Sequence, residues 1–224
     1  MFSGLIEAKT QIVALLPEPG GVRLQLAMPT SFDDVSLGDS IAVQGCCLPV
    51  VELPGQLDNL SASGETSDIG TSGRGPQRVF GFQAGRETLA KTSLGARQAG
   101  DWLNVERSLA LGDRIGGHLV TGHVDGPGEL LSREDEAEWS TMVFTANVTL
   151  MRQMASKGSI TIDGVSLTLV DVTDQSFSVA LIPHTLQHTT LGELKPGDRV
   201  NLETDLLAKY VQRQLVFATT PFQS

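Results

Sequence analysis

Cys47 is the residue of this sequence best suited to covalent chemistry, and it lies in the stretch DSIAVQGCCLPVV at residues 39–51. A cysteine thiolate is the strongest ordinary nucleophile in proteins when its surroundings lower the pKa of the thiol. A similar stretch, GSITIDGVSLTLV, returns at residues 158–170 and has Ser166 at the position of Cys47. A thiol and a hydroxyl at matched positions predict two related pockets with unequal chemistry. Burial of Cys47 as a packing residue on a strand is the alternative.

Cys46 aligns with Val165 of the second stretch. Successive side chains of a strand point to opposite faces, so Cys46 is interpreted as a core residue rather than a second reactive thiol. Adjacent cysteines do not ordinarily bridge each other, which fits a reduced, cytoplasmic protein.

The histidines could act as acids, bases or metal ligands. His118 and His123 are five residues apart in GGHLVTGHVDG, which on a strand places them on opposite faces and gives no metal pair. The glycines around them indicate a close approach of backbone to another group. His184 and His188 have the spacing of helical metal ligands, but Pro183 argues against a long helix there. The sequence therefore predicts no metal site.

The chain is interpreted as an internal duplication. Three further pairs of segments repeat in the same order. They are FSGLIEA from Phe2 with VTGHVDG from Val120, ETLAKTSLG from Glu87 with HTLQHTTLG from His184, and GDWLNVE from Gly100 with GDRVNLE from Gly197. The last two pairs lie closer together in sequence because the first copy carries an insert, predicted at residues 54–78 and rich in Gly, Ser and Thr. A surface loop is the favoured interpretation of this insert, with a lid over a site as the alternative.

Short segments of alternating apolar and polar residues, such as SITIDGVSLTLVDV and VRLQLAM, predict strands. Repeated short strands without long helices between them predict an all-β fold of two tandem antiparallel barrels. The N-terminal barrel is expected at residues 1–110 and the C-terminal barrel at residues 111–203.

The end of the chain differs, because Leu207, Val211 and Leu215 recur every four residues. This period predicts an amphipathic helix at residues 204–218. The helix either packs on its own barrel or pairs with copies of itself. Self-association is favoured, since a single terminal helix has only its own barrel wall as another partner.

Composition argues against several classes of partner. The 224 residues carry a net charge of −10 and no basic stripe, so nucleic acid is not expected as a ligand. No apolar run reaches the length of a membrane span, and MFSGLIEAKT lacks the regions of a secretory signal. The protein is therefore expected to work in the cytoplasm without contact with a membrane.

Six ordered motifs resemble the riboflavin synthase family, of the alpha-chain type. They are MFSGLIE, NVERSL, GGHLVTGHVDG, KGSITIDGVSLTLV, LIPHTLQHTTLG and VNLETDLLAKYV, and they span nearly the whole chain apart from the insert. The resemblance implies two six-stranded antiparallel Greek-key barrels and a C-terminal helix that builds a homotrimer. It also implies an active site between the N-terminal barrel of one subunit and the C-terminal barrel of its neighbour. Association with lumazine synthase is left open.

The reaction implied by the resemblance is a dismutation. Two molecules of 6,7-dimethyl-8-ribityllumazine give riboflavin and 5-amino-6-ribitylaminouracil by transfer of a four-carbon unit, without a cofactor or a metal. A base or water takes a proton from the C7 methyl group, and water or a side chain adds at C7 of the partner ring. Two like substrates account for two like pockets, and stacking of the two rings supplies proximity.

The resemblance also implies which residues form the site. Those at catalytic positions are Cys47, Ser40, His118 and His123. Those at substrate-binding positions are Gly4, Leu5, Ile6, Cys47, Leu48, Pro49, Arg86, Glu87, Thr88, Gly122, His123, Val124, Lys157, Ser166, Leu167, Thr168, Leu181, Ile182, Pro183, His184, Thr185 and Leu186.

The chain departs from the family pattern in QGCCLPV, where Gln44 replaces an asparagine and Pro49 replaces a threonine. Proline offers neither a hydroxyl nor a backbone N–H. Two functions are therefore compared. An active riboflavin synthase is preferred because Cys47, His118 and His123 are present, whereas Pro49 and the insert favour a lumazine- or flavin-binding protein without turnover.

Overall fold

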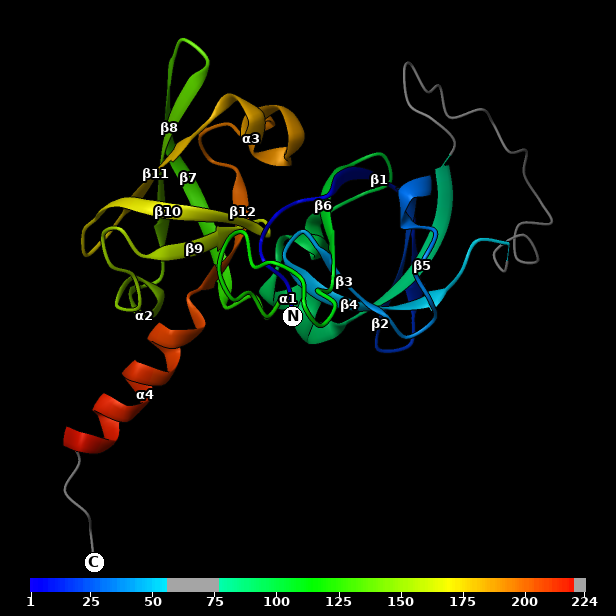
Figure 1. Ribbon diagram of the computed structural model, residues 1–224, viewed down its shortest axis with the longest axis horizontal. Helices are drawn as coiled ribbons and strands as arrows, with labels where there is room; N and C mark the ends of the chain where they lie inside the picture. The colour runs from blue at the N-terminus through cyan, green and yellow to red at the C-terminus, as the bar shows by residue number, and fades with distance from the viewer. Residues whose placement is uncertain (56–76, 220–224) are drawn as a thin grey trace, which may run out of the picture.

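The computed structural model describes residues 1–55 and 77–219, so most of the insert expected at 54–78 lies outside the described residues. Two barrels lie side by side in Figure 1, with the N-terminal segment and the linker between the barrels running along their junction. This arrangement places the two segments that enter the barrels next to the strands that carry Cys47 and Ser166.

The N-terminal barrel is a closed ring of antiparallel strands in the order β1-β2-β5-β4-β3-β6. Its strands are β1 (Ala8–Glu18), β2 (Gly21–Pro29), β3 (Ser40–Val43), β4 (Cys46–Glu52), β5 (Gln77–Gly85) and β6 (Trp102–Arg107). Short helices connect them, namely η1 (Thr30–Phe32), α1 (Arg86–Lys91) and η3 (Ser93–Ala96). Alternate residues such as Leu24, Leu26, Phe80 and Phe82 point inward and are buried, and Cys46 joins this core as expected.

The C-terminal barrel closes in the order β10-β11-β8-β7-β12-β9, which is the connectivity of the first barrel when followed from β7. Its strands are β7 (Gly126–Glu136), β8 (Trp139–Ala146), β9 (Ser159–Ile162), β10 (Val165–Val172), β11 (Phe177–Leu181) and β12 (Arg199–Thr204). Its short helices are α2 (Val148–Met151), α3 (Pro183–His188) and η4 (Thr190–Glu193). The expected all-β fold of two six-stranded barrels is confirmed.

The two barrels meet at the tips of matched hairpins. Gln44 and Gly45 turn β3 into β4, and Asp163 and Gly164 turn β9 into β10, all four with positive φ. Such two-residue turns match the right-handed twist of antiparallel strands. The tips touch so closely that a Cβ atom on Gly45 would lie 2.8 Å from the nitrogen of Gly164. Glycine at both tips is therefore required for the barrels to dock.

Helix α4 (Leu206–Thr219) follows the C-terminal barrel and projects away from it (Figure 1). Asp205 caps the first turn by accepting the Leu207 N–H at 2.9 Å, and Lys209 pairs with Asp125 at 2.8 Å. Tyr210 and Val211 are 65% and 58% exposed, so this part of the apolar face is not covered by the chain's own barrel. Within the described part of the chain, no helix combines the length and hydrophobicity needed to cross a bilayer.

Candidate functional site

The thiol of Cys47 lies on the outer face of the N-terminal barrel. In the register of β3 and β4, Ser40 lies opposite Pro49 and Ala42 lies opposite Cys47, so these four residues share one face. Leu48 belongs to the other face and is 3% exposed, in the core. Strand alternation thus brings Ser40 and Cys47 to the same surface of the sheet.

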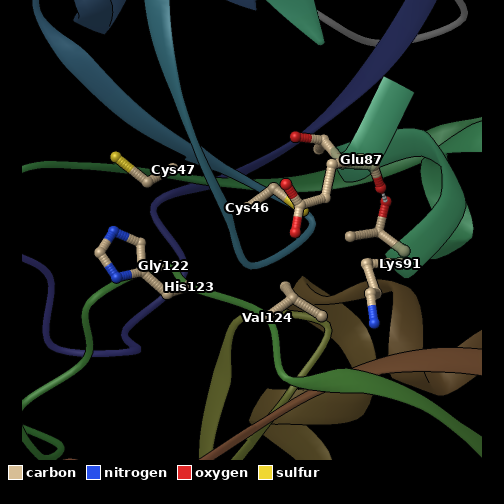
Figure 2. Close-up of a pocket in the computed structure, with 9 residues that line it drawn as sticks. Cys46, Cys47, Glu87, Lys91, Gly122, His123 and Val124 are labelled. Carbon is tan, nitrogen blue, oxygen red and sulfur yellow. Dashed lines mark hydrogen bonds between the residues drawn. The ribbon is translucent and has the colours of Figure 1, made fainter. Parts of the chain in front are cut away.

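A cavity of about 290 Å³ opens beside Cys47, between β4, helix α1 and the segment that leads into the C-terminal barrel. Figure 2 shows Cys47 and His123 on one side of this cavity and Glu87 and Lys91 on the other. Residues that carry a thiol, an imidazole, a carboxylate and an ammonium group therefore line one space of small-molecule size. The residues that line it are Cys46, Cys47, Glu87, Thr88, Lys91, Thr92, Gly122, His123 and Val124.

The segment over this cavity is held against Cys47 by its backbone. The Cys47 N–H donates to the Gly122 carbonyl at 2.8 Å. Gly122 has φ +77°, and a Cβ atom there would lie 2.7 Å from the Cys47 Cβ. Only glycine fits both the left-handed backbone and this close approach, and the next residue, His123, then reaches the cavity. The glycines of the sequence motif indicated such an approach.

His118 and His123 do not lie on a strand, so the premise that a strand separates them is wrong. The segment makes a single bridge, between Val120 and Phe2, and is otherwise irregular because its backbone bonds go to other elements. The two imidazole rings nevertheless lie at different sites. His123 is exposed beside Cys47, whereas His118 is half-buried and its Nδ1 lies 2.7 Å from the Ser166 hydroxyl. Each histidine therefore serves a different barrel.

Ser166 occupies the position on the C-terminal barrel that Cys47 occupies on the N-terminal barrel. The Ser166 N–H donates to the Gly4 carbonyl at 2.8 Å. Gly4 has φ +79°, and a Cβ atom there would lie 2.6 Å from the Ser166 Cβ. The residue after Gly4 is Leu5, so an aliphatic side chain stands where the first site has His123.

Burial changes the acidity of Cys46 and His118, which lie near these sites. Loss of solvation raises the pKa of Cys46 to about 12, which keeps that thiol protonated and unreactive at neutral pH. Burial also lowers the pKa of His118 from its ordinary value, which favours the neutral imidazole. Of the two cysteines, only Cys47 is both partly exposed and adjacent to the cavity.

The remaining sequence-predicted contacts divide between the two barrels. Lys157 is exposed and has φ +68° at the position that Gly38 fills in the first barrel. An unusual backbone for a lysine often marks a functional position. Leu48 and Leu181 point into the barrel cores at 3% and 1% exposure, so only their backbone atoms could meet a ligand.

Sequence reasoning missed Lys91 and Thr92, which line the cavity at the end of α1. The signal was available, because Glu87 and Lys91, and likewise Thr88 and Thr92, are four residues apart and share a helix face. The Thr92 hydroxyl donates to the Thr88 carbonyl at 2.7 Å and caps the helix end.

The histidines of α3 take the positions of Glu87 and Lys91 in the second barrel. His184 and His188 lie on a short helix, as Pro183 at its start suggested, and their rings stack with centroids 4.1 Å apart. Across the described residues, no group of three His, Cys, Asp or Glu side chains is placed to hold a metal ion.

Comparison with known proteins agrees with the duplication. The model of the lumazine binding domain matches twice, at residues 3–108 and 121–205. A riboflavin synthase of Brucella abortus is 39% identical over 213 residues, covering 95% of this chain and 97% of that protein. A riboflavin synthase of Bacillus subtilis is 34% identical over 215 residues, covering 96% of this chain and 90% of that protein.

Solved structures show the same fold at lower identity. A crystal structure of LumP complexed with 6,7-dimethyl-8-(1'-D-ribityl) lumazine superposes with a TM-score of 0.73 at 21% identity, over 91% of this chain and 99% of that one. LumP complexed with riboflavin gives 0.74 at 23% identity, over the same shares of the two chains. With both barrels matched by the domain model and nearly the full length matched by relatives, this chain belongs to the family of lumazine binding domain proteins, as a tandem-barrel member.

Proposed function

We propose that the protein is a riboflavin synthase, a transferase that converts two molecules of 6,7-dimethyl-8-ribityllumazine into riboflavin and 5-amino-6-ribitylaminouracil. The observation that carries the proposal is a pair of matched but unequal positions, Cys47 beside a cavity on one barrel and Ser166 on the other, each held by the same backbone contact to a covering glycine. A reaction between two identical molecules needs two like binding sites, and a directional transfer needs them to differ. The riboflavin synthases among its relatives support the same function.

The N-terminal pocket supplies the groups that the reaction requires. The C7 methyl group of one lumazine must lose a proton, and His123 is an exposed imidazole at the cavity that can accept it. A nucleophile must add at C7 of the other lumazine, and the Cys47 thiol, or a water beside it, lies at the same cavity. Ser40 shares the face of Cys47 and offers a hydroxyl for hydrogen bonding.

The C-terminal pocket supplies binding and orientation. His118 fixes the Ser166 hydroxyl through its Nδ1, and Thr168 lies on the same face of β10. Hydroxyls and strand-edge backbone groups recognise a flat polar ring by directional hydrogen bonds. The proposed catalytic set is thus Cys47, Ser40 and His123 at one barrel and His118 at the other.

A binding protein without turnover is the second candidate, and Pro49 is the observation that favours it. Compared with the threonine of the family pattern, Pro49 lacks a hydroxyl on the face that carries Cys47 and an N–H at the edge of the strand. The likeness to LumP concerns the fold, and Cys47 beside His123 weighs for the enzyme.

The exposed face of α4 supports a proposal for the assembly. Tyr210 and Val211 keep an apolar face open to solvent, and we propose that this face joins copies of the chain into a homotrimer. A chain ending at residue 203 is expected to elute as a monomer on a sizing column, whereas the full chain elutes as a trimer. Association with lumazine synthase and a cytoplasmic location stay predictions from the sequence.

The test of function mixes the purified full-length protein with 6,7-dimethyl-8-ribityllumazine alone and follows riboflavin absorbance. The enzyme is expected to form one riboflavin for every two lumazines consumed. A change in lumazine fluorescence without riboflavin would instead identify the binding protein.

A further inference from the structure

Glu203 on β12 is a buried carboxylate that holds the segment lying over Cys47. Glu203 is 2% exposed. Its Oε1 accepts the Thr121 N–H at 2.8 Å and the Thr121 hydroxyl at 2.7 Å, and its Oε2 accepts the Gly122 N–H at 2.9 Å. The Gly122 carbonyl then accepts the Cys47 N–H at 2.8 Å. A chain of hydrogen bonds therefore runs from the C-terminal barrel to the reactive cysteine of the N-terminal barrel.

Glu106 on β6 makes the equivalent arrangement at the matched position of the other barrel. It is 3% exposed, and its Oε1 accepts the Ser3 N–H at 2.7 Å and the Ser3 hydroxyl at 2.9 Å. Its Oε2 accepts the Gly4 N–H at 3.0 Å. The Gly4 carbonyl accepts the Ser166 N–H at 2.8 Å. A carboxylate of the N-terminal barrel is thus connected to the pocket of the C-terminal barrel.

We propose that Glu203 and Glu106 are crossed positioning residues. Glu203 sets the Cys47 pocket of the opposite barrel, and Glu106 sets the Ser166 pocket of the opposite barrel. The proposal rests on the function proposed above and explains how the two pockets are built as one unit. Neither glutamate lines the Cys47 cavity, so each acts through the segment it holds.

These hydrogen bonds to Glu203 and Glu106, called the glutamate clamps, matter because the two chain segments that they hold have little regular structure of their own. Apart from the bridge between Phe2 and Val120, neither contains regular secondary structure before its barrel begins. Hydrogen bonds from neutral donors to a buried carboxylate are short and strong, so they fix the position of the backbone. His123 directly follows Gly122, so loss of the Glu203 clamp moves the imidazole relative to Cys47.

Amide hydrogen exchange at two positions of the full-length protein tests the crossing without any measurement of turnover. Glu203→Gln replaces one acceptor oxygen by an NH₂ group that faces a donor. Exchange of the Cys47 N–H is then expected to speed up about tenfold, while the Ser166 N–H stays within about twofold of the wild-type protein. Glu106→Gln is the matched variant and is expected to give the reverse pattern, fast exchange at Ser166 and little change at Cys47.

Either of two results would overturn the proposal. One is acceleration at both amides by each variant to the same degree, which would mean that the glutamates stabilise the fold as a whole. The other is acceleration within the same barrel as the substitution. Should a glutamine variant fail to fold, Thr121→Val and Ser3→Ala each remove the hydroxyl that donates to the glutamate and keep the carboxylate. The Thr121 hydroxyl also accepts the His123 N–H at 3.3 Å, so Ser3→Ala is the simpler of the two variants. They are expected to show the same crossed pattern at about two- to threefold.

Steady-state kinetics then connect the clamps to the reaction. Because the chemistry is proposed at Cys47, Glu203→Gln is expected to lower kcat, while Glu106→Gln, which loosens the Ser166 pocket, is expected mainly to raise KM. A protein that shows crossed exchange but makes no riboflavin would overturn the proposed function and leave the positioning roles standing. A protein that makes riboflavin but shows no crossed exchange would overturn the positioning roles and leave the proposed function standing.

Discussion

The two barrels share one backbone framework and differ in the side chains on their outer faces and at their junction. Both have the same strand order and a hairpin tip with a left-handed glycine. Each also has a buried glutamate that accepts hydrogen bonds from the segment lying over Cys47 or Ser166 of the opposite barrel. These features depend on backbone geometry, which both copies need in order to close and to dock. The differences gather on the outer face and at the junction, as the pairs Cys47 and Ser166, His123 and Leu5, Glu87 and His184, Lys91 and His188, Pro49 and Thr168, and Gln44 and Asp163. The comparison indicates that both copies kept the framework, while the partly exposed thiol and the exposed imidazole lie together at only one of the two matched positions.

The largest expected effect comes from making the reactive position alike in both barrels. Cys47→Ser gives the N-terminal pocket the hydroxyl of the other barrel. Riboflavin formation is expected to fall about 100-fold or more, because a hydroxyl is a far weaker nucleophile than a thiolate at neutral pH. Lumazine affinity, measured by fluorescence titration, is expected to stay within about threefold, since the two side chains are nearly the same size. The matched variant Ser166→Ala is expected to weaken binding more than it lowers turnover. Unchanged turnover in Cys47→Ser would reduce Cys47 to a packing residue.

A second exchange concerns the residue that follows each covering glycine. His123→Leu gives the Cys47 pocket the aliphatic group that Leu5 provides in the other barrel. The value of kcat is expected to drop about 30-fold, because a positioned acid–base group is removed while the covering segment stays in place. Leu5→Ala is the control and is expected to leave kcat within about threefold. Equal losses from both variants would show that the position serves packing rather than proton transfer.

The third contrast is buried at the junction, where Gln44 of one hairpin tip corresponds to Asp163 of the other. Asp163 is fully buried, and desolvation raises its pKa to about 7 although the Asn201 N–H donates to it and Arg97 lies nearby. The folded protein therefore keeps a proton on Asp163 between about pH 4 and pH 7, while the unfolded chain releases it. Stability falls as the pH rises through this window, because the folded state binds more protons there. The amide of Gln44 cannot contribute such a dependence.

Asp163→Asn is therefore expected to flatten the dependence of stability on pH. At pH 8 the variant is expected to be more stable than the wild-type protein by about 1–3 kcal/mol, and near pH 4.5 the two are expected to be similar. Urea unfolding at the two pH values and at one protein concentration measures the difference. Gln44→Glu places a second carboxyl beside Asp163 and is expected to make the loss of stability at high pH larger. A wild-type stability that does not fall between pH 4.5 and pH 8 would contradict the buried carboxyl account.

The duplication made the two-barrel framework predictable from the sequence, because similar residues at matched positions form the same strands and turns in both copies. The period of four in α4 and the alternation that buries Cys46 are local signals, and the structure confirms both elements. The pairing of His118 with Ser166 was not predictable in this way. It depends on the segment before β7 lying beside the N-terminal segment, where the His118 N–H donates to the Ser3 carbonyl at 3.2 Å, and that arrangement is a long-range property of the chain. Lys91 was not predicted because the family resemblance implied only Arg86, Glu87 and Thr88, at the start of α1.

The smallest expected effect concerns Pro49 and Thr168, which lie two residues after Cys47 and Ser166. The Val50 N–H donates to the Asp39 carbonyl at 2.8 Å, on the side of β3. Donors alternate along a strand, so the nitrogen of Pro49 points to the other side, where pairing with β5 begins only at Val50. This is why a proline fits here within a sheet without breaking a ladder bond.

Pro49→Thr would add a hydroxyl on the face of Cys47 and an N–H at the open strand edge, as Thr168 provides them beside Ser166. Lumazine is expected to bind about threefold more tightly, the value of one added neutral hydrogen bond, with kcat little changed. The reverse variant, Thr168→Pro, is expected to weaken binding by a similar factor. Fluorescence titration of both variants, each checked for an unchanged melting temperature, measures the pair. If neither affinity moves, this strand edge does not touch the ligand, and the difference between the pockets lies in Cys47 and His123. If only Pro49→Thr changes the affinity for lumazine, the N-terminal pocket is the weaker binding site. Its proline then lowers the affinity by a small factor.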